Sequence, residues 1–221
     1  MFGSHLSIAG GMSNALIAAA ELKMDCVQVF TKNQRQWNAK PLEEQEIESW
    51  LNELQNNGWD GNGKTVSHNS YLINLASPDA RARKKSMALQ REEIERCETL
   101  HIPFLVSHPG ARLGTPRNRT DANALAQQPT PEEIDGLQRI VKSLDQLHAE
   151  LPGYSTITCL ETTVGSGTNL GYDFQHLAWI HSHAVQPERI AFCFDTCHVT
   201  AAGYDMSTMA EAQSVLQQFD D

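Results

Sequence analysis

The residue types best suited to chemistry lie in the stretch CFDTCHVTAAGYD, residues 193–205. An apolar run from Ile190 to Phe194 ends at Asp195, and His198 follows three positions later. A carboxylate and an imidazole at this spacing can bind a metal ion or transfer protons. The residue types elsewhere in the chain decide between these two chemistries.

Similar side chains end other apolar runs. An acid or a histidine lies at or near the C-terminal edge of five of the six short apolar runs: His5, His68, His108, Glu161 and Asp195. Each histidine taken alone is better explained as a hydrogen-bonded loop residue, but a glutamate after a buried strand is unfavourable unless it is paired or binds metal. Together, two imidazoles and two carboxylates form a donor set for zinc or manganese. Such a centre suits displacement at phosphorus or the isomerisation of a sugar.

The apolar runs alternate with segments that have a helical pattern. The expected strands are residues 2–8, 26–30, 65–67, 102–107, 156–160 and 190–194. The expected helices are residues 13–23, 43–57, 79–100, 131–150, 173–183 and 207–219. Ser77 is expected to cap the third helix, and Thr130 with Glu133 the fourth. Alternation of this kind predicts a parallel sheet.

Two architectures fit this alternation, an open doubly wound sheet and a (β/α)8 barrel. In a barrel the C-terminal strand ends converge on one rim, where catalytic groups lie, whereas an open sheet spreads them along a line. The recurrent polar strand ends favour an α/β fold of the TIM-barrel type. We expect about six βα units, in a single domain that covers residues 1–221.

Composition narrows the class of protein. The chain has 221 residues and a formal net charge of −10, which argues against a general nucleic-acid coat but leaves room for a local basic face. No stretch is long and apolar enough for a membrane span, and the N-terminal segment lacks the pattern of a signal peptide. The five cysteines, with no CxxC, do not form a disulfide framework. A cytoplasmic location is expected.

Basic and aromatic residues gather in FTKNQRQWNAK, residues 30–40. Lys32, Arg35 and Lys40 lie beside glutamines and Trp37, a mixture that suits phosphate contact and base stacking. The alternative is a solvated loop with one tryptophan in the core. Further candidates are Tyr71 and Leu72, an aromatic and an aliphatic residue after His68 that could enter a base stack. Arg112, Arg117 and Arg119, in the irregular segment 111–131, are candidates for phosphate contact.

The remaining polar patterns are interpreted as structural. Five histidines lie in predicted helices or at the opposite ends of strands: His101, His148, His176, His181 and His183. Of these, His148 and His176 are expected to be helical and solvated. GSGTNLG at 165–171 has the wrong spacing for a dinucleotide-binding loop.

Several blocks resemble the endonuclease IV family of apurinic/apyrimidinic endonucleases. These blocks are GSHLSIAGG, FTKNQRQW, HNSYLINL, HPGA, LETTVGSGTNLG and FDTCHVTAAGYD, and the resemblance covers nearly the whole chain. It implies a (β/α)8 barrel with three zinc ions at its C-terminal rim. It also implies cleavage of double-stranded DNA on the 5′ side of an abasic site, leaving a 3′-hydroxyl and a 5′-deoxyribose phosphate. No membrane and no obligate protein partner are implied.

The resemblance also implies roles for individual residues. His68, His108 and Glu161 would bind the first zinc, and Glu161, the expected catalytic carboxylate, would bridge to a second ion shared with Asp195. His198 would bind the third. Arg35 and Gln36 match the loop that enters the DNA at the lesion. Tyr71 and Leu72 match residues that press into the minor groove.

The C-terminal part departs from the family pattern. The family supplies a His, an Asp-x-His pair and a Glu beyond the sixth strand, but no histidine follows His198 in this chain. We therefore expect a C-terminally incomplete barrel with roughly one tightly bound zinc ion instead of three and with impaired activity. Two other readings stay open: a metal-dependent sugar isomerase or epimerase on a related barrel, and a catalytically impaired protein that binds damaged DNA.

Overall fold

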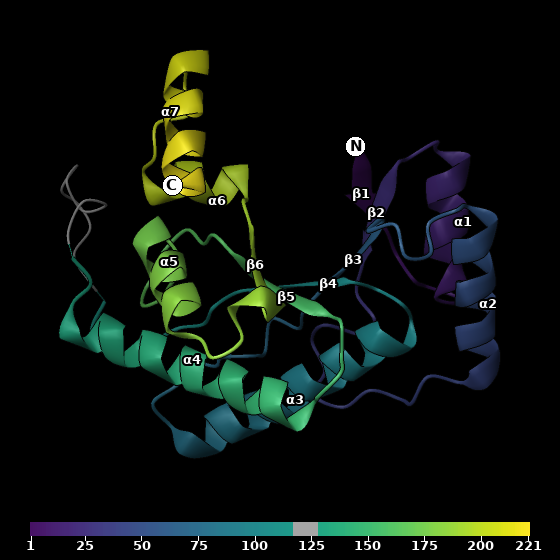
Figure 1. The fold of residues 1–221 in the computed structure, drawn as a ribbon, viewed down its shortest axis with the longest axis horizontal. Coiled ribbons are helices and arrows are strands. Elements are labelled where there is room, and N and C mark those ends of the chain that lie inside the picture. Colours follow the sequence, from purple (N-terminus) through teal and green to yellow (C-terminus); the bar gives the residue numbers. More distant parts are fainter. Residues whose placement is uncertain (117–127) are drawn as a thin grey trace. The chain divides into compact units, whose positions relative to one another are not determined.

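A computed structural model describes residues 1–116 and 128–221. Strands and helices alternate along the chain, which the colours of Figure 1 trace from the N-terminus to the C-terminus. The strands are β1 (Gly3–His5), β2 (Cys26–Val29), β3 (Thr65–His68), β4 (Phe104–Ser107), β5 (Ile157–Glu161) and β6 (Ile190–Cys193). The helices are α1 (Ser13–Glu21), α2 (Glu44–Asn56), α3 (Ala80–Thr99), α4 (Pro131–Glu150), α5 (Phe174–His183), the 3-10 turn η1 (Pro187–Arg189), α6 (Thr196–Ala202) and α7 (Met209–Asp220).

The strands form one sheet whose order follows the sequence, from β1 to β6. The pairs β1–β2, β2–β3 and β3–β4 are parallel, with His5 opposite Gln28 and Ser67 opposite Leu105. Since each strand is followed by a helix before its neighbour, the predicted βα alternation and parallel pairing are confirmed for these strands.

Two helix starts show how local sequence fixes the boundaries. At α4, Thr130 Oγ1 accepts from Glu133 N at 3.3 Å and Glu133 Oε2 accepts from Thr130 N at 2.8 Å, which is the predicted capping box. At α3, the prediction that Ser77 is the cap is wrong. The carboxylate of Asp79 accepts from the amides of Arg81 and Ala82, because it lies directly before the first free N–H groups of the helix.

Helix α6 was missed by the sequence patterns because it is only seven residues long. Asp195 is its N-cap, and the left-handed Gly203, with φ of 110°, ends it. The helix predicted at 207–219 is α7, so a short extra helix stands between β6 and α7.

The described residues cluster into two compact units. The first comprises residues 1–73, 85–107 and 151–159, and the second comprises residues 74–84, 108–150 and 160–221. The expectation of a single domain over residues 1–221 stays a prediction. None of the helices in the described parts is both long and apolar enough to span a bilayer.

The first unit has an apolar core between helices and strands. Helices α1 and α2 lie side by side, and α1 also contacts β2. Leu16 of α1, Trp50 of α2 and Leu105 of β4 are completely buried in this core. The indole of Trp50 donates to the carbonyl of Leu100 at 2.8 Å, which satisfies its one polar atom.

The second unit is built on contact between α4 and α5. Leu137, Ile140 and Leu144 of α4 and Ile180 of α5 are completely buried. The prediction that His148 and His176 are solvated is wrong, because they face inward and are 2% and 1% exposed. The Nδ1 atom of His176 accepts from the amide of Gly171 at 3.2 Å, so this imidazole supports a loop.

Candidate metal centre

The ends of β5 and β6 are joined in the second unit by hydrogen bonds from one residue. Thr162 N donates to the carbonyl of Cys193 at 2.9 Å, and Thr162 Oγ1 accepts from Asp195 N at 2.9 Å. Glu161 precedes Thr162 directly, so these bonds place Glu161 and Asp195 at the same edge of the sheet. The predicted convergence of strand ends is confirmed for this pair.

Helix α6 turns His198 toward the same edge. The Oδ1 atom of Asp195 accepts from His198 N at 2.8 Å, which fixes the first turn of the helix. The imidazole Nδ1 lies 2.8 Å from the carbonyl oxygen of Thr162. Because a carbonyl oxygen only accepts, Nδ1 carries the proton and the lone pair is on Nε2. Such a backbone contact commonly orients a metal-binding histidine.

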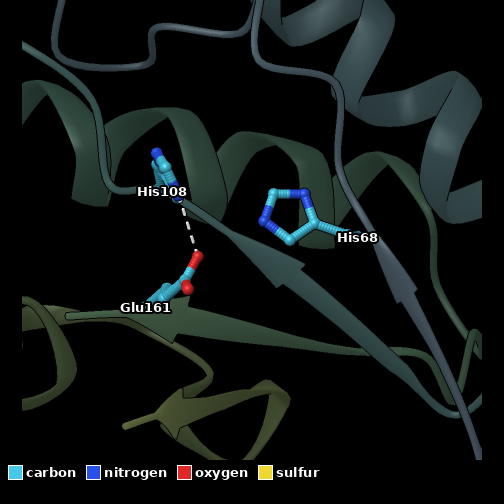
Figure 2. A group of neighbouring side chains, drawn as sticks. All are labelled: His68, His108 and Glu161. Atoms are coloured by element: carbon cyan, nitrogen blue, oxygen red, sulfur yellow. Dashed lines mark ion pairs between the residues drawn. The ribbon is translucent and has the colours of Figure 1, made fainter. Parts of the chain in front are cut away.

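Glu161 lies between two imidazoles. Its Oε2 is 2.9 Å from Nε2 of His108 (Figure 2), and its Oε1 is 3.6 Å from Nδ1 of His198. The Glu161 side chain is only 7% exposed, whereas those of His108 and His198 are 34% and 27% exposed. A buried carboxylate requires such partners, because burying an isolated charge is unfavourable.

The turn after His108 is held by a side chain from another loop. Asn74 Oδ1 accepts from Ala111 N at 2.9 Å, and Asn74 Nδ2 donates to Ala111 O at 2.9 Å. Gly110 adopts a φ of +120°, and a Cβ atom there would lie 2.6 Å from Asn74 Oδ1. The HPG sequence therefore allows a close approach that fixes the backbone beside His108.

The segment 165–171 links this turn to the end of β5. Leu170 N donates to Gly110 O at 2.8 Å, and Thr163 N donates to Gly171 O at 3.1 Å. Gly171 adopts a φ of +89°, and a Cβ atom there would lie 2.8 Å from Cγ of Pro109 and 3.3 Å from the carbonyl of Glu161. Gly171 thus allows the close packing of Pro109 against the end of β5, beside His108 and Glu161.

The donor set in the second unit fits a metal ion. One ligand atom from each of Glu161, Asp195 and His198 lies within 4.8 Å of the other two. Two ligand atoms on a tetrahedral zinc ion lie roughly 3.4 Å apart, given bonds of about 2.1 Å. The 2.9 Å contact between His108 and Glu161 is shorter than that separation, so the two side chains would move apart by about 0.5 Å to share an ion. Carboxylates and imidazoles are ordinary zinc ligands.

His68 lies at the end of β3 in the first unit and is 8% exposed. Its Nδ1 lies 2.8 Å from the carbonyl oxygen of Asn69, which places the proton on Nδ1 and the lone pair on Nε2, as in His198. Its ring contacts that of Tyr71, with centroids 5.0 Å apart, and that of Phe30 at 5.5 Å. That His68 shares a metal ion with His108 and Glu161 stays a prediction.

The other predicted site residues also lie in the first unit. Arg35 and Gln36 are exposed in the loop after β2, Tyr71 is 60% exposed after β3, and Leu72 is half-buried. Ser70 Oγ donates to the carbonyl of Gln34 at 2.8 Å and so ties the two loops together. The structure therefore brings the loop of Arg35 beside the loop of Tyr71, but it does not test what they bind.

Some basic residues differ from their predicted roles. Lys32 is only 6% exposed, and its ammonium donates to backbone carbonyls instead of facing solvent. Arg112 is also buried and donates to the carbonyls of Leu113 and Thr115 in its own loop. Arg117 and Arg119 lie outside the described residues. Lys85 of α3 also contacts the loop of Lys32, since its Nζ lies 3.9 Å from the centre of the Trp37 ring.

Comparisons with known proteins agree with this geometry. A family model described as a xylose isomerase-like TIM barrel matches residues 16–220. Over 219 residues the chain is 40% identical to a probable endonuclease 4 of Chloroflexus aurantiacus, covering 99% of this chain and 70% of that protein. It is 39% identical over 218 residues to a probable endonuclease 4 of Geotalea daltonii, with the same coverage.

Solved structures show the same fold. The crystal structure of endonuclease IV from Thermus thermophilus superposes with a TM-score of 0.78 at 27% identity, over 99% of this chain and 70% of that one. The D-psicose 3-epimerase of Clostridium cellulolyticum H10 gives a TM-score of 0.65 at 15% identity, covering 99% of this chain and 71% of that one, which shows the fold alone. The predicted TIM-barrel type of fold is therefore confirmed, with six strands in the described residues.

Proposed function

Because the chain belongs to the endonuclease IV family of xylose isomerase-like TIM barrels, we propose that it acts in DNA repair as a zinc-dependent nuclease. The substrate is double-stranded DNA that contains an abasic site. The bond hydrolysed is the phosphodiester on the 5′ side of the lesion, which leaves a 3′-hydroxyl and a 5′-deoxyribose phosphate. The observation that carries the proposal is the buried Glu161 carboxylate between the imidazoles of His108 and His198.

The residues that would hold zinc are assigned by the family pattern. His68, His108 and Glu161 would hold one ion, Glu161 would bridge to a second that Asp195 also binds, and His198 would bind a third. In support, Asp195 uses Oδ1 to cap α6, which leaves Oδ2, 3.7 Å from His198 Nδ1, for a metal ion. When bound, zinc at such a centre supplies an activated water and neutralises charge on the oxygen that leaves phosphorus.

The chain's own residues orient the centre. The carbonyls of Asn69 and Thr162 each accept from a histidine Nδ1, so Nε2 of each ring is the nitrogen that would bind metal. Glu161 can use both carboxylate oxygens, because its burial and its two imidazole neighbours hold it in one orientation. Glu161 is for this reason the residue proposed to be indispensable for catalysis.

The loops of the first unit are proposed to bind the DNA. Arg35 and Gln36 would enter the duplex at the lesion, and Tyr71 with Leu72 would press into the minor groove. In support, Arg35, Gln36 and Tyr71 are exposed although the loops that carry them are hydrogen-bonded to each other. Exposed side chains on a fixed backbone suit insertion into a base stack.

The sugar epimerase alternative has weaker support. The relatives at 39–40% identity are probable endonucleases, whereas the epimerase likeness at 15% identity extends only to the fold. A small sugar also needs no exposed arginine and tyrosine on two linked loops.

The deciding experiment is a nicking assay with added zinc on a duplex that carries one abasic site. We expect cleavage 5′ to the site and a 3′ end that a polymerase extends, with no turnover of ketose sugars by the same protein. Elemental analysis of the same sample should find about one tightly bound zinc ion per chain, because His68, His108 and Glu161 together would supply three protein ligands for one ion. Binding of abasic duplex without cleavage would favour the damaged-DNA-binding alternative, and sugar turnover would favour the epimerase.

A further inference from the structure

A group of buried charges lies beneath the loop 31–40 in the first unit. Lys32 and Glu93 are 6% and 1% exposed, and Arg96 of α3 is half-buried beside them. Nothing in the proposed chemistry uses these three residues. A buried ammonium or carboxylate is retained only where charged or polar partners offset its desolvation, so the partners show what the group does.

Lys32 holds the middle of the loop. Its Nζ donates to the carbonyl of Gln36 at 2.9 Å and to that of Trp37 at 3.2 Å. These carbonyls follow Arg35 in the chain, so the ammonium fixes the backbone on the C-terminal side of that side chain. Hydrogen bonds from a charged donor are about twice as strong as those between neutral groups.

Arg96 holds the two ends of the same loop. Its Nη1 donates to Lys40 O at 3.1 Å, its Nη2 donates to Thr31 O, and its Nε lies 3.2 Å from Thr31 Oγ1. A single planar guanidinium thus joins the first and last residues of the loop. Its fork of fixed donors is suited to this task, whereas a lysine would reach only one of the carbonyls.

Glu93 supplies the negative charge between these cations. Its Oε2 accepts from Thr31 Oγ1 at 2.7 Å. Burial raises the pKa of the Glu93 carboxyl, while the Thr31 hydroxyl and the charges of Lys32 and Arg96 act in the opposite direction. Two cations face one carboxylate, so part of their donor capacity is left for the loop carbonyls.

The loop itself contains a turn that presents two exposed side chains. Arg35 N donates to Asn33 Oδ1 at 2.9 Å, and Gln36 N donates to Asn33 O at 3.1 Å. Ser70 Oγ adds a bond to the carbonyl of Gln34 at 2.8 Å. The carbonyls of this turn accept hydrogen bonds from Lys32 and Ser70, and the side chains of Arg35 and Gln36 are exposed to solvent.

We infer that Lys32 and Arg96, with Glu93 as their counter-charge, are positioning residues that hold the Arg35–Gln36 turn ready to discriminate abasic from intact duplex. This inference rests on the proposed function. Order in the unbound loop reduces the conformational entropy lost on binding, so it strengthens binding without contact with the ligand. Lys32 therefore acts on DNA recognition without touching DNA.

The test uses Lys32→Met, with Lys142→Met as the control, because Lys142 is an exposed lysine of α4 that lies outside the proposed DNA-binding loops. Trypsin cleavage of the native protein after Arg35 reports the order of the turn independently of DNA. Anisotropy with duplexes that differ only in one abasic analogue reports discrimination. In Lys32→Met we expect several-fold faster cleavage and about a tenfold loss of preference for the abasic duplex, at unchanged zinc content.

Two further variants complete the experiment. Lys32→Arg keeps a charged donor and should restore part of the preference, which a purely steric role would not. Arg96→Gln releases the ends of the loop and should give the same pattern if Lys32→Met does not fold. Unchanged cleavage after Arg35 in both Lys32→Met and Arg96→Gln overturns the inference, as does faster cleavage with an unchanged duplex preference. If the wild-type protein does not distinguish the two duplexes, the proposed function is contradicted instead. The trypsin result then tests only whether Lys32 and Arg96 position the turn.

Discussion

Nε2 of His108 lies 2.9 Å from Oε2 of Glu161, which is an ordinary hydrogen-bonding distance. In the proposed metal centre both atoms would be ligands, and each would have to be unprotonated to bind the ion. The backbone beside the pair is fixed by contacts of the surrounding loops, among them Asn74 with Ala111 and Gly171 with Pro109.

Replacing Glu161 by glutamine keeps the shape of the side chain and removes its charge. We expect zinc affinity and strand cleavage to fall by at least ~100-fold, because even residues that only support metal ligands contribute about 10- to 100-fold. Elemental analysis and the nicking assay measure the two effects. Glu132→Gln, at an exposed position of α4, is the control and should retain both properties.

Replacing Gly171 by alanine tests the loop that supports the pair. The new Cβ would meet Pro109 at 2.8 Å with the backbone at a positive φ, so we expect a loss of roughly 2–4 kcal/mol in the free energy of unfolding. Gly167→Ala is the matched control in the same segment, since it also has a positive φ but nothing within 4 Å of the added atom. It should lose only about 1 kcal/mol. Equal losses in urea denaturation would show that the contact with Pro109 is unimportant.

The positions of Glu161 and Asp195 could be predicted from sequence because period and polarity mark where a buried strand ends. The contacts that support the His108–Glu161 pair could not be predicted from the sequence. They join distant loops, such as Gly171 with Pro109 and Asn74 with Ala111, and leave no periodic signal. Lys32 shows the same limit, since a lysine among polar neighbours is expected in solvent and only the fold shows the carbonyls that it meets.

Replacing Tyr71 by alanine removes the most exposed aromatic ring beside His68, at 60% exposure. We expect affinity for abasic duplex to fall about tenfold, which is within the range for the loss of one stacking aromatic. Zinc content should change less, because His68 is oriented by its bond to Asn69 O. Val185→Ala removes an exposed apolar side chain of the second unit and serves as the control. An unchanged DNA affinity in Tyr71→Ala would show that Tyr71 does not press into the minor groove.

His148 makes the stability of the second unit depend on pH. The imidazole is 2% exposed, and among the described residues neither ring nitrogen has a hydrogen-bond partner. Burial, and then the charge of Arg189, lower its pKa from 6.5 to about 4, with Glu188 acting in the opposite direction. The unfolded chain therefore takes up this proton first as the pH falls. Stability is retained above about pH 6.5, declines as the pH falls from there to about 4, and changes no further below that.

At pH 5 the loss from His148 amounts to about 2 kcal/mol, or roughly 5 °C in the melting temperature of a chain of this size. His148→Met cannot be protonated and leaves no polar atom without a partner, so its melting temperature should fall less between pH 7.5 and pH 5 than that of the wild type. His183→Met, which removes an exposed imidazole of the same unit, should keep the wild-type slope. Melting curves are recorded with a chelator present, so that release of metal by protons does not contribute. Parallel slopes for the wild type and His148→Met would mean that the folded protein does not disfavour protonation of His148, and the assignment of the pH dependence to this residue would then be wrong.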